Sequence, residues 1–203
     1  MEVKKLSAVN EVQQLLQKYS SVLEEGIGEI KDIQARLTIN QSVKPIFCKA
    51  RPVPFALKTK VEEEIENLVN QGVLKKVNSS NWATPVVPIV KPNGKIRLCG
   101  DFKTTINKFF LVDNHPLSTV NELFSNVAGG DKFTKIDLSQ AYLHLPVHTS
   151  DRHLLTLNTH KGLYECTRLM FGVASATAIW QREIEKILIG IPGVTVFLDD
   201  YSL

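Results

Sequence analysis

The sequence has few cysteines and no long apolar run, and these two absences narrow the class of protein. Its three cysteines, at positions 48, 99 and 166, are odd in number and widely spaced, which argues against a disulfide framework or a zinc site and indicates a reducing compartment. No apolar stretch approaches the length of a membrane span, and residues 1–5 lack the apolar core of a signal peptide. We therefore expect an intracellular, cytoplasmic protein without a membrane segment.

Several signatures of enzyme classes are also missing. The sequence has no internal repeat, no low-complexity segment, no glycine-rich phosphate-binding loop and no evident Ser-His-Asp or Cys-His set. His144 and His148 have the i, i+4 spacing of a helical zinc site, but Pro146 between them argues against that helix. Neither hydrolytic chemistry nor zinc chemistry is favoured.

What is present is ordinary globular composition with an uneven distribution of charge. The 203 residues are 43% hydrophobic and 22% charged, enough to form the core of one domain or two small ones, and the net charge is +3. Residues 72–110 nevertheless hold seven Lys and Arg against one Asp, which exceeds the balance of the whole chain. Such a segment fits a polyanionic partner, and it fits a solvated charged face equally well.

Hydrophobic periodicity predicts four helices, at residues 7–19, 59–71, 119–127 and 175–189. Thr59 and Glu62 have the spacing of a capping box at the start of the second helix, and Gly72 can end it in the left-handed conformation. Residues 20–58 contain repeated Gly and Pro, so we interpret them as an extended arm without a separate domain.

Alternating apolar residues and turn signals predict the strands. Residues 84–90 and 95–99 form a hairpin around Pro92-Asn93-Gly94, and the prolines at 85 and 88 indicate an edge strand. Alternation places Lys95 and Arg97 on the face opposite Ile96 and Leu98. A second hairpin is expected at 154–158 and 163–169, a short helix at 139–145, and single strands at 133–138 and 194–198.

Carboxylates follow the two single strands, Asp137 after the first and Asp199-Asp200 after the second. A surface turn is the ordinary interpretation of an isolated Asp-Asp pair. If the strands are neighbours, however, the carboxylates converge, and a cation must neutralise them. Oxygen ligands without nearby His or Cys favour Mg²⁺ or Mn²⁺. We expect Asp137 and Asp199 to be direct ligands and Asp200 to be a supporting carboxylate, because adjacent strand residues face opposite ways.

From about Arg51 to its end, the sequence resembles the reverse transcriptase domain of gypsy-like long-terminal-repeat retrotransposon polyproteins. The motifs that carry the resemblance are, in order, Ser80-Asn81-Trp82-Ala83-Thr84-Pro85, Lys91-Pro92-Asn93-Gly94-Lys95-Ile96-Arg97, Gly100-Asp101-Phe102-Lys103 with Asn107, Pro116-Leu117, Phe133-Thr134-Lys135-Ile136-Asp137-Leu138-Ser139-Gln140-Ala141-Tyr142, Thr159-His160-Lys161-Gly162-Leu163-Tyr164, Met170-Phe171-Gly172-Val173 and Phe197-Leu198-Asp199-Asp200. Each motif is modest alone, but their common order over some 150 residues is specific.

The resemblance implies an α+β fold, the fingers and palm of a right-hand polymerase, with an antiparallel palm sheet and packed helices. Residues 1–50 would be an N-terminal helix and connector, and residues 51–203 the fingers and palm. The activity would be RNA-directed DNA synthesis, with Asp137, Asp199 and Asp200 holding two Mg²⁺ ions. The partners would be an RNA/DNA template-primer, a deoxynucleoside triphosphate and the remaining polyprotein domains: thumb, ribonuclease H and integrase.

The same resemblance assigns a nucleotide-binding set. Arg97, with Lys91 and Lys95, would bind the triphosphate, and Phe171 with Gly172 would pack against the nucleotide and template. Tyr142 would lie under the sugar and exclude a ribose 2′-hydroxyl, although a half-buried tyrosine of the core is the plainer interpretation.

The sequence departs from the family pattern at a few positions. Thr177 and Ser118 stand where proline is usual, Phe197 replaces a usual Tyr, and the sequence stops soon after Asp200. We therefore expect the return strand of the Asp-Asp hairpin, the primer grip, the thumb and the ribonuclease H domain to be absent. Two alternatives stay open: an inactive transposon-derived relic that at most binds nucleic acid, and an RNA-copying polymerase, which would have no reason to keep Tyr142 as a gate.

Overall fold

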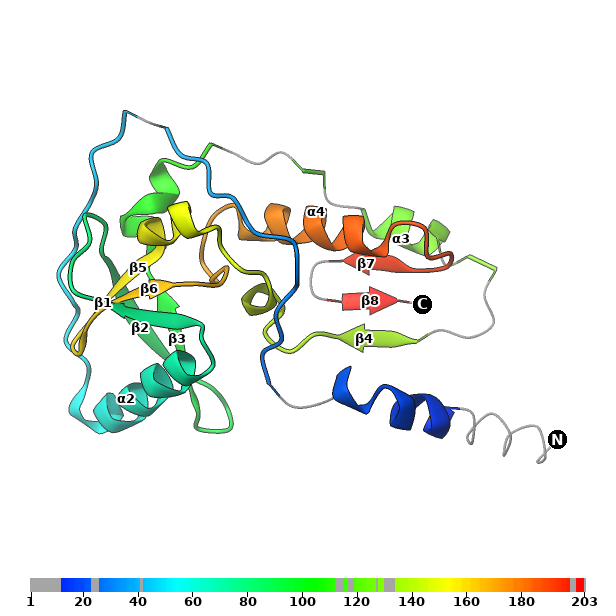
Figure 1. Cartoon of the computed structure of the whole chain (residues 1–203), viewed down its shortest axis with the longest axis horizontal. Coiled ribbons are helices and arrows are strands. Elements are labelled where there is room, and N and C mark those ends of the chain that lie inside the picture. The colour runs from blue at the N-terminus through cyan, green and yellow to red at the C-terminus, as the bar shows by residue number, and fades with distance from the viewer. Residues whose placement is uncertain are drawn as a thin grey trace.

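Two β-sheets organise the chain, one built from its middle and one mainly from its end (Figure 1). A computed structural model describes residues 12–22, 26–40, 42–111, 115–116, 119–126, 128–129, 134–197 and 200–202. Within these ranges one continuous core runs beneath both sheets. It includes Ile65, Phe102, Leu157 and Trp180, which are all nearly inaccessible to solvent.

The larger sheet has five strands in the order β1-β6-β5-β2-β3. All neighbours are antiparallel except β2 and β5, which pair in parallel over two residues. Its strands are β1 (Leu74–Val77), β2 (Thr84–Val90), β3 (Ile96–Gly100), β5 (Thr156–Thr159) and β6 (Gly162–Cys166). The two predicted hairpins are therefore confirmed as β2–β3 and β5–β6.

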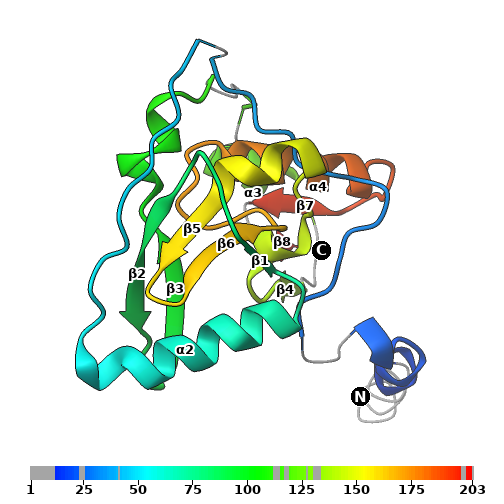
Figure 2. The ribbon, with the colours of Figure 1, turned by 60° about the vertical axis from the view of Figure 1, so that its left-hand side comes forward.

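Helix α2 (Phe55–Asn70) covers this sheet and buries Val61, Ile65 and Leu68 (Figure 2). Gly72 adopts a φ of +71°, so the predicted left-handed end of the helix is confirmed. The predicted capping box is wrong, because the helix begins at Phe55, a turn before Thr59, after Pro54 and without a side-chain cap. The fixed φ of proline suits a helix start and replaces the cap expected from the sequence.

The prediction that β2 is an edge strand is also wrong, since β2 lies between β5 and β3. From Val86 onward, however, β2 pairs only with β3, and Pro88 lies in this one-sided part. A proline is tolerated where one side of the strand has no partner. The edge strand β1 was not predicted. It carries the exposed Lys75 and Lys76, and lysine is common on sheet edges because its charge discourages further pairing.

The smaller sheet has three antiparallel strands in the order β4-β8-β7. They are β4 (Lys135–Asp137), β7 (Thr195–Phe197) and β8 (Asp200–Ser202). The expected absence of the return strand is wrong, because β8 is that strand and lies in the centre of the sheet. Helices α3 (Val120–Asn126) and α4 (Ala176–Leu188) contact β7 and lie along that side of the sheet (Figure 1).

Short 3-10 helices make most of the remaining connections. They are η1 (Ser20–Val22), η2 (Phe102–Thr104), η3 (Ile106–Lys108), η4 (Ala141–His144) and η5 (Thr149–Leu155). The predicted helix at 139–145 is thus the 3-10 turn η4, which follows Gln140 in the left-handed conformation. His144 ends η4 and His148 caps η5, so the two histidines do not share a helix, in line with the sequence. Residues 12–18 are helical with an exposed apolar stripe, and residues 7–11 of that predicted helix lie outside the described ranges.

The arm that precedes α2 is extended, as predicted, and it packs against the start of β2 and against the segments around η3, η4 and η5. Its Ala35 lies in the core and its amide donates to the carbonyl oxygen of Pro146 at 2.7 Å. Further along, the amide of Cys48 donates to Ala83 O at 2.9 Å, at the start of β2. The arm, blue to cyan in Figure 2, therefore belongs to the folded unit, while the division into residues 1–50 and 51–203 stays a prediction.

Two carboxylates anchor the arm. Glu29 on the arm pairs with Arg168 at 2.7 Å, and the Arg168 side chain is only 9% exposed. Asp151 of η5 is buried and accepts the amide of Leu37 at 3.0 Å, while Arg36 Nε lies 3.2 Å from the same carboxylate oxygen. Asp151 thus satisfies a buried backbone donor, which an exposed ion pair does not do.

We predict that Asp151→Ala lowers the free energy of unfolding by about 2–3 kcal/mol, because it leaves the buried Leu37 amide without an acceptor. Lys161→Ala is the control, since Lys161 is 43% exposed, its ion pair with Glu62 lies at the surface, and such pairs contribute at most about 1 kcal/mol. Urea unfolding monitored by tryptophan fluorescence measures both. Equal effects of the two substitutions would contradict the anchoring role of Asp151.

None of the helices that the structure describes is both long and apolar enough to cross a bilayer.

Candidate active site

Three residues of the predicted nucleotide-binding set meet at Phe171. The guanidinium carbon of Arg97, on β3, lies 5.1 Å from the centre of the Phe171 ring. The ring of Tyr142, on η4, lies 4.8 Å from the same ring at a tilt of 55°. Residues separated by more than seventy positions in the sequence therefore form one cluster, which we call the Phe171 cluster.

The Phe171 cluster has one buried and one open side. Trp180 of α4 is fully buried and meets Tyr142 edge-on, with ring centres 6.0 Å apart. Tyr142 and Phe171 are half-buried, and Arg97 is exposed. The aromatic contacts fix the rings from the core side, and the attraction of a guanidinium to an aromatic face holds Arg97 above them. The open side thus presents a positive charge beside an aromatic surface.

Gly172 continues the cluster as bare backbone. Its φ is +90°, and an added Cβ would lie 3.2 Å from the carbonyl oxygen of Gly100 at the end of β3. A side chain would be strained by both the backbone conformation and this close approach. The glycine therefore lets the loop after Phe171 rest directly on β3, the strand that carries Arg97.

Asn107 holds the same loop, and reasoning from the sequence gave it no role. Its Nδ2 donates to Gly172 O at 2.8 Å, and its Oδ1 accepts the amide of Ala174 at 3.0 Å. One side chain thus satisfies a donor and an acceptor of a loop that has no regular secondary structure. The sequence contained Asn107 as part of a motif, but nothing in it indicated a partner 65 residues away.

Lys91 lies near Arg97 at the β2–β3 turn. Burial raises the pKa of the Cys99 thiol on β3, and the positive charges of Arg97 and Lys91 oppose that rise. The charges of Arg97 and Lys91 therefore both lie close enough to Cys99 on β3 to affect its thiol. Lys91 is half-buried, in contrast to the exposed Arg97.

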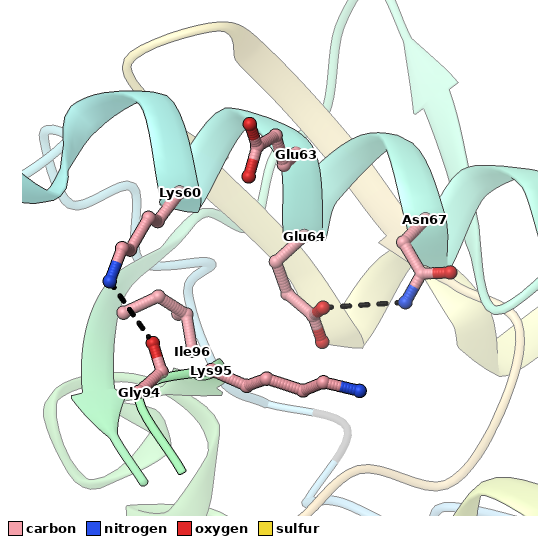
Figure 3. A pocket seen from close by; sticks show the side chains of 7 residues that line it. All are labelled: Lys60, Glu63, Glu64, Asn67, Gly94, Lys95 and Ile96. Carbon is pink, nitrogen blue, oxygen red and sulfur yellow. Dashed lines mark hydrogen bonds between the residues drawn. The ribbon is translucent and has the colours of Figure 1, made fainter.

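Lys95 lies elsewhere, in a pocket of about 410 Å³ between α2 and the tip of the β2–β3 hairpin (Figure 3). The residues that line the pocket are Lys60, Glu63, Glu64, Asn67, Gly94, Lys95 and Ile96. Lys95 and Arg97 are both exposed, whereas Ile96 and Leu98 are buried, which agrees with the predicted alternation. The role of Lys95 at the nucleotide stays a prediction.

Contacts between the residues that line the pocket hold the hairpin tip against α2. Lys60 Nζ donates to Gly94 O at 3.3 Å. Burial raises the pKa of the Glu64 carboxyl, although a hydrogen bond from Asn67 and the charges of Lys91 and Lys95 oppose the rise. Arg97 and Phe171 do not line this pocket. We therefore regard the pocket as a support for the hairpin and place the candidate site at the Phe171 cluster.

The register of the smaller sheet determines which of the predicted acidic residues lie opposite each other. Asp137 of β4 pairs directly with Asp200 of β8, and Phe197 of β7 pairs with Asp200 on the other side. Directly opposed residues of antiparallel strands have Cα atoms roughly 4.5–5.5 Å apart. The two predicted strands, β4 and β7, are therefore not direct neighbours: β8 lies between them and places Asp200 opposite Asp137. Asp137 is exposed.

Asp199 and the side chain of Asp200 lie outside the described part of the chain, as does Ser118. Within the described part no three His, Cys, Asp or Glu side chains gather closely enough to hold a metal ion. The three-carboxylate metal site thus stays a prediction that rests on Asp137 and on the backbone register.

Comparison with known proteins identifies the class that this geometry defines. The family model described as "Reverse transcriptase (RNA-dependent DNA polymerase)" matches residues 89–203, more than half of the chain. The chain therefore belongs to the reverse transcriptase family. A foamy virus protease-reverse transcriptase, solved in complex with an RNA/DNA hybrid, has the same fold with a TM-score of 0.83 and 23% identity over 96% of this chain and 26% of that one.

The curated relatives are much longer proteins. An uncharacterized protein of Caenorhabditis elegans, K02A2.6, is 34% identical over 184 residues, which are 90% of this chain and 14% of that protein. The retrovirus-related Pol polyprotein from transposon opus of Drosophila melanogaster is 31% identical over 173 residues, 78% of this chain and 17% of that protein. The chain thus spans less than a fifth of these relatives. The predicted fold class is confirmed: the chain has an α+β fold with a five-stranded and a three-stranded sheet, which fits the fingers and palm of a reverse transcriptase.

We predict that Asn107→Ala lowers the free energy of unfolding by about 1–2 kcal/mol, because the loop after Phe171 loses two hydrogen bonds. Asn107→Asp is the matched variant: it keeps an acceptor for the Ala174 amide and loses only the bond to Gly172 O. In thermal and urea unfolding, Asn107→Ala should lose more stability than Asn107→Asp. A wild-type unfolding curve for Asn107→Ala would show that the loop is held by other contacts.

Proposed function

We propose that this chain is the fingers and palm part of the RNA-directed DNA polymerase of a gypsy-like long-terminal-repeat retrotransposon. It would bind an RNA/DNA template-primer and transfer a nucleotide from a deoxynucleoside triphosphate to the primer 3′-hydroxyl. In the full polyprotein it would act together with a thumb, a ribonuclease H and an integrase. The curated relatives are several times longer, and one of them is a transposon polyprotein, which supports this proposal.

The observation that carries the proposal is the meeting of Arg97 and Tyr142 on Phe171. A nucleoside triphosphate needs a cation for its phosphates and an apolar surface for its sugar and base, a few ångströms apart. Arg97 lies 5.1 Å and Tyr142 4.8 Å from one ring. In the proposed architecture Arg97 would belong to the fingers and Tyr142 to the palm. A ligand placed on the open side of the cluster would touch both parts of the protein at once.

The chain's own side chains would divide the work as follows. The exposed guanidinium of Arg97 would grip phosphate oxygens with two parallel N–H donors, and the ammonium groups of Lys91 and Lys95 would add positive charge from the hairpin tip. The Tyr142 ring would lie under the sugar and leave no room for a 2′-hydroxyl. Gly172, without a side chain, would let the nucleotide and template approach the backbone beside Phe171.

The acidic residues suit a hard cation. Asp137 and Asp200 provide only oxygen donors, they stand opposite each other in the register, and Asp137 is exposed, so an ion and its water ligands can reach it. We propose that Asp137, Asp199 and Asp200 hold two Mg²⁺ ions, which Mn²⁺ can replace. Bound ions of this kind make the primer 3′-hydroxyl a better nucleophile and neutralise charge on the triphosphate.

The template-primer would lie across the fingers and palm. The structural neighbour of the same fold was solved with an RNA/DNA hybrid, and the exposed Lys75, Lys103 and Lys108 of the fingers can contact phosphates without reading sequence. This assignment gives the basic segment at 72–110 a role beyond solvation.

We predict that Asp137→Asn weakens Mg²⁺-dependent binding of a deoxynucleoside triphosphate at least about tenfold, because charge-assisted contacts contribute about 1.5–3 kcal/mol. Isothermal titration calorimetry of the chain with dATP, with and without Mg²⁺, measures this change. Asp32→Asn is the control: Asp32 is exposed, has a φ of +64° that Asn tolerates, and lies on the arm.

A relic that only binds nucleic acid would give a different result. It would bind a template-primer duplex with normal salt dependence, but it would show no Mg²⁺-dependent dATP binding that Asp137→Asn removes. That result would contradict the polymerase assignment and favour the relic.

A further inference from the structure

Thr177 stands where the family resemblance has a proline, and the structure gives this departure a partner. The residue is the second of α4, and its Oγ1 lies 3.3 Å from the hydroxyl oxygen of Tyr142. Proline has no side-chain hydrogen-bonding group and could not make this contact. The departure therefore changes the surroundings of the one tyrosine assigned to the nucleotide sugar.

We propose that Thr177 is a positioning residue for Tyr142, and that it sharpens the choice between deoxyribose and ribose in this protein. The proposal rests on the proposed function, in which Tyr142 lies under the sugar. It adds a residue, a contact and a direction of effect that the proposed function does not contain.

The contact fixes a degree of freedom that the aromatic packing leaves open. The Tyr142 ring touches Phe171 at 4.8 Å on one side and meets the edge of Trp180 at 6.0 Å on another. These contacts limit translation of the ring, but they do not bind its hydroxyl. Among the residues that the structure describes, Thr177 is the hydrogen-bond partner of that hydroxyl.

The position of the Tyr142 ring matters because the ring excludes a 2′-hydroxyl by occupying the space where that group would lie. If the ring swings away by a fraction of an ångström, a 2′-hydroxyl gains room and ribose is excluded less well. Both Tyr142 and Thr177 are half-buried, so the contact is near the open side of the cluster and not deep in the core. Thr177 anchors the hydroxyl end of the ring to α4, and α4 is fixed by the fully buried Trp180.

The size of the effect follows from the length of the contact. A separation of 3.3 Å is at the long end for two hydroxyl groups, so its net contribution is at the low end for a hydrogen bond. We expect a loss of selectivity of about 2- to 5-fold when the contact is removed. The affinity for the deoxynucleotide should change less than the affinity for the ribonucleotide, because a well-placed Tyr142 ring excludes only the nucleotide that carries a 2′-hydroxyl.

The experiment compares the dissociation constants of dATP and ATP for the chain with Mg²⁺, and its readout is their ratio. Thr177→Val keeps the shape and removes the hydroxyl, whereas Thr177→Ser keeps the hydroxyl. Thr177→Pro restores the usual residue, and the first turn of a helix accepts proline because its amides have no partner within the helix. Tyr142→Phe removes the other half of the pair. Thr159→Val, in the β5–β6 hairpin, is the control for the loss of a threonine hydroxyl elsewhere.

We expect the ratio to fall about 2- to 5-fold in Thr177→Val, Thr177→Pro and Tyr142→Phe, and to fall no further in the Tyr142→Phe/Thr177→Val double variant. Thr177→Ser and Thr159→Val should keep the wild-type ratio. A wild-type ratio in Thr177→Val, with both nucleotides still bound, would overturn this inference and leave the proposed function intact. A wild-type chain that binds neither nucleotide would overturn the proposed function and this inference with it.

Discussion

The contact between the Arg97 guanidinium and the Phe171 ring joins β3 of the larger sheet to the loop before α4, and the proposed chemistry depends on it. Arg97 is exposed on β3 and has no fixed position unless the ring holds it. Phe171 can hold it because the following loop is fastened, by Asn107 to η3 and by the close approach of Gly172 to Gly100. A cation over an aromatic face contributes roughly 0.5–1 kcal/mol at an exposed site, little for stability but sufficient to select one arrangement of a side chain.

The carboxylate side depends on a different constraint, the register of a three-stranded sheet. β8 lies between β4 and β7, and its first residue, Asp200, is opposed by Asp137 on one side and by Phe197 on the other. A slip of β4 by one residue would move Asp137 off Asp200 and turn the side chains of β4 to the opposite face of the sheet. The helices α3 and α4 support the β7 side, where Gln181 of α4 donates to the carbonyl oxygen of Val196 at 3.1 Å. The exposed edge at β4 leaves Asp137 accessible.

Sequence reasoning succeeded where local pattern decides the structure and failed where distant contacts decide it. The apolar stripe that ends at Gly190 predicted α4 closely, and alternation around a glycine turn predicted β5–β6. Asp200, Tyr201 and Ser202 have no marked strand pattern. They form β8 because strands on both sides complete their hydrogen bonds, which no local pattern reveals. The capping box at Thr59 gave way to Pro54. Within the candidate site, the motif containing Phe171 and the spacing of Tyr142 from Asp137 selected two residues that are in contact in the structure, and their roles stay predictions. The contact of Asn107 with Gly172 spans 65 residues, and that of Thr177 with Tyr142 spans 35. The sequence showed only that Asn107 belongs to a motif and that Thr177 departs from one, and neither fact identified the partner.

The proposed site depends on the coupling between Arg97 on β3 and Phe171 in the loop before α4. A double-mutant cycle in urea unfolding tests this directly, with Arg97→Met, which keeps the apolar stem, Phe171→Leu, and the two combined. We expect a coupling free energy of about 0.5–1 kcal/mol, so that the double variant is less destabilised than the sum of the single variants. Single effects that add to within roughly 0.3 kcal/mol would show that the two side chains are independent and would contradict the claim.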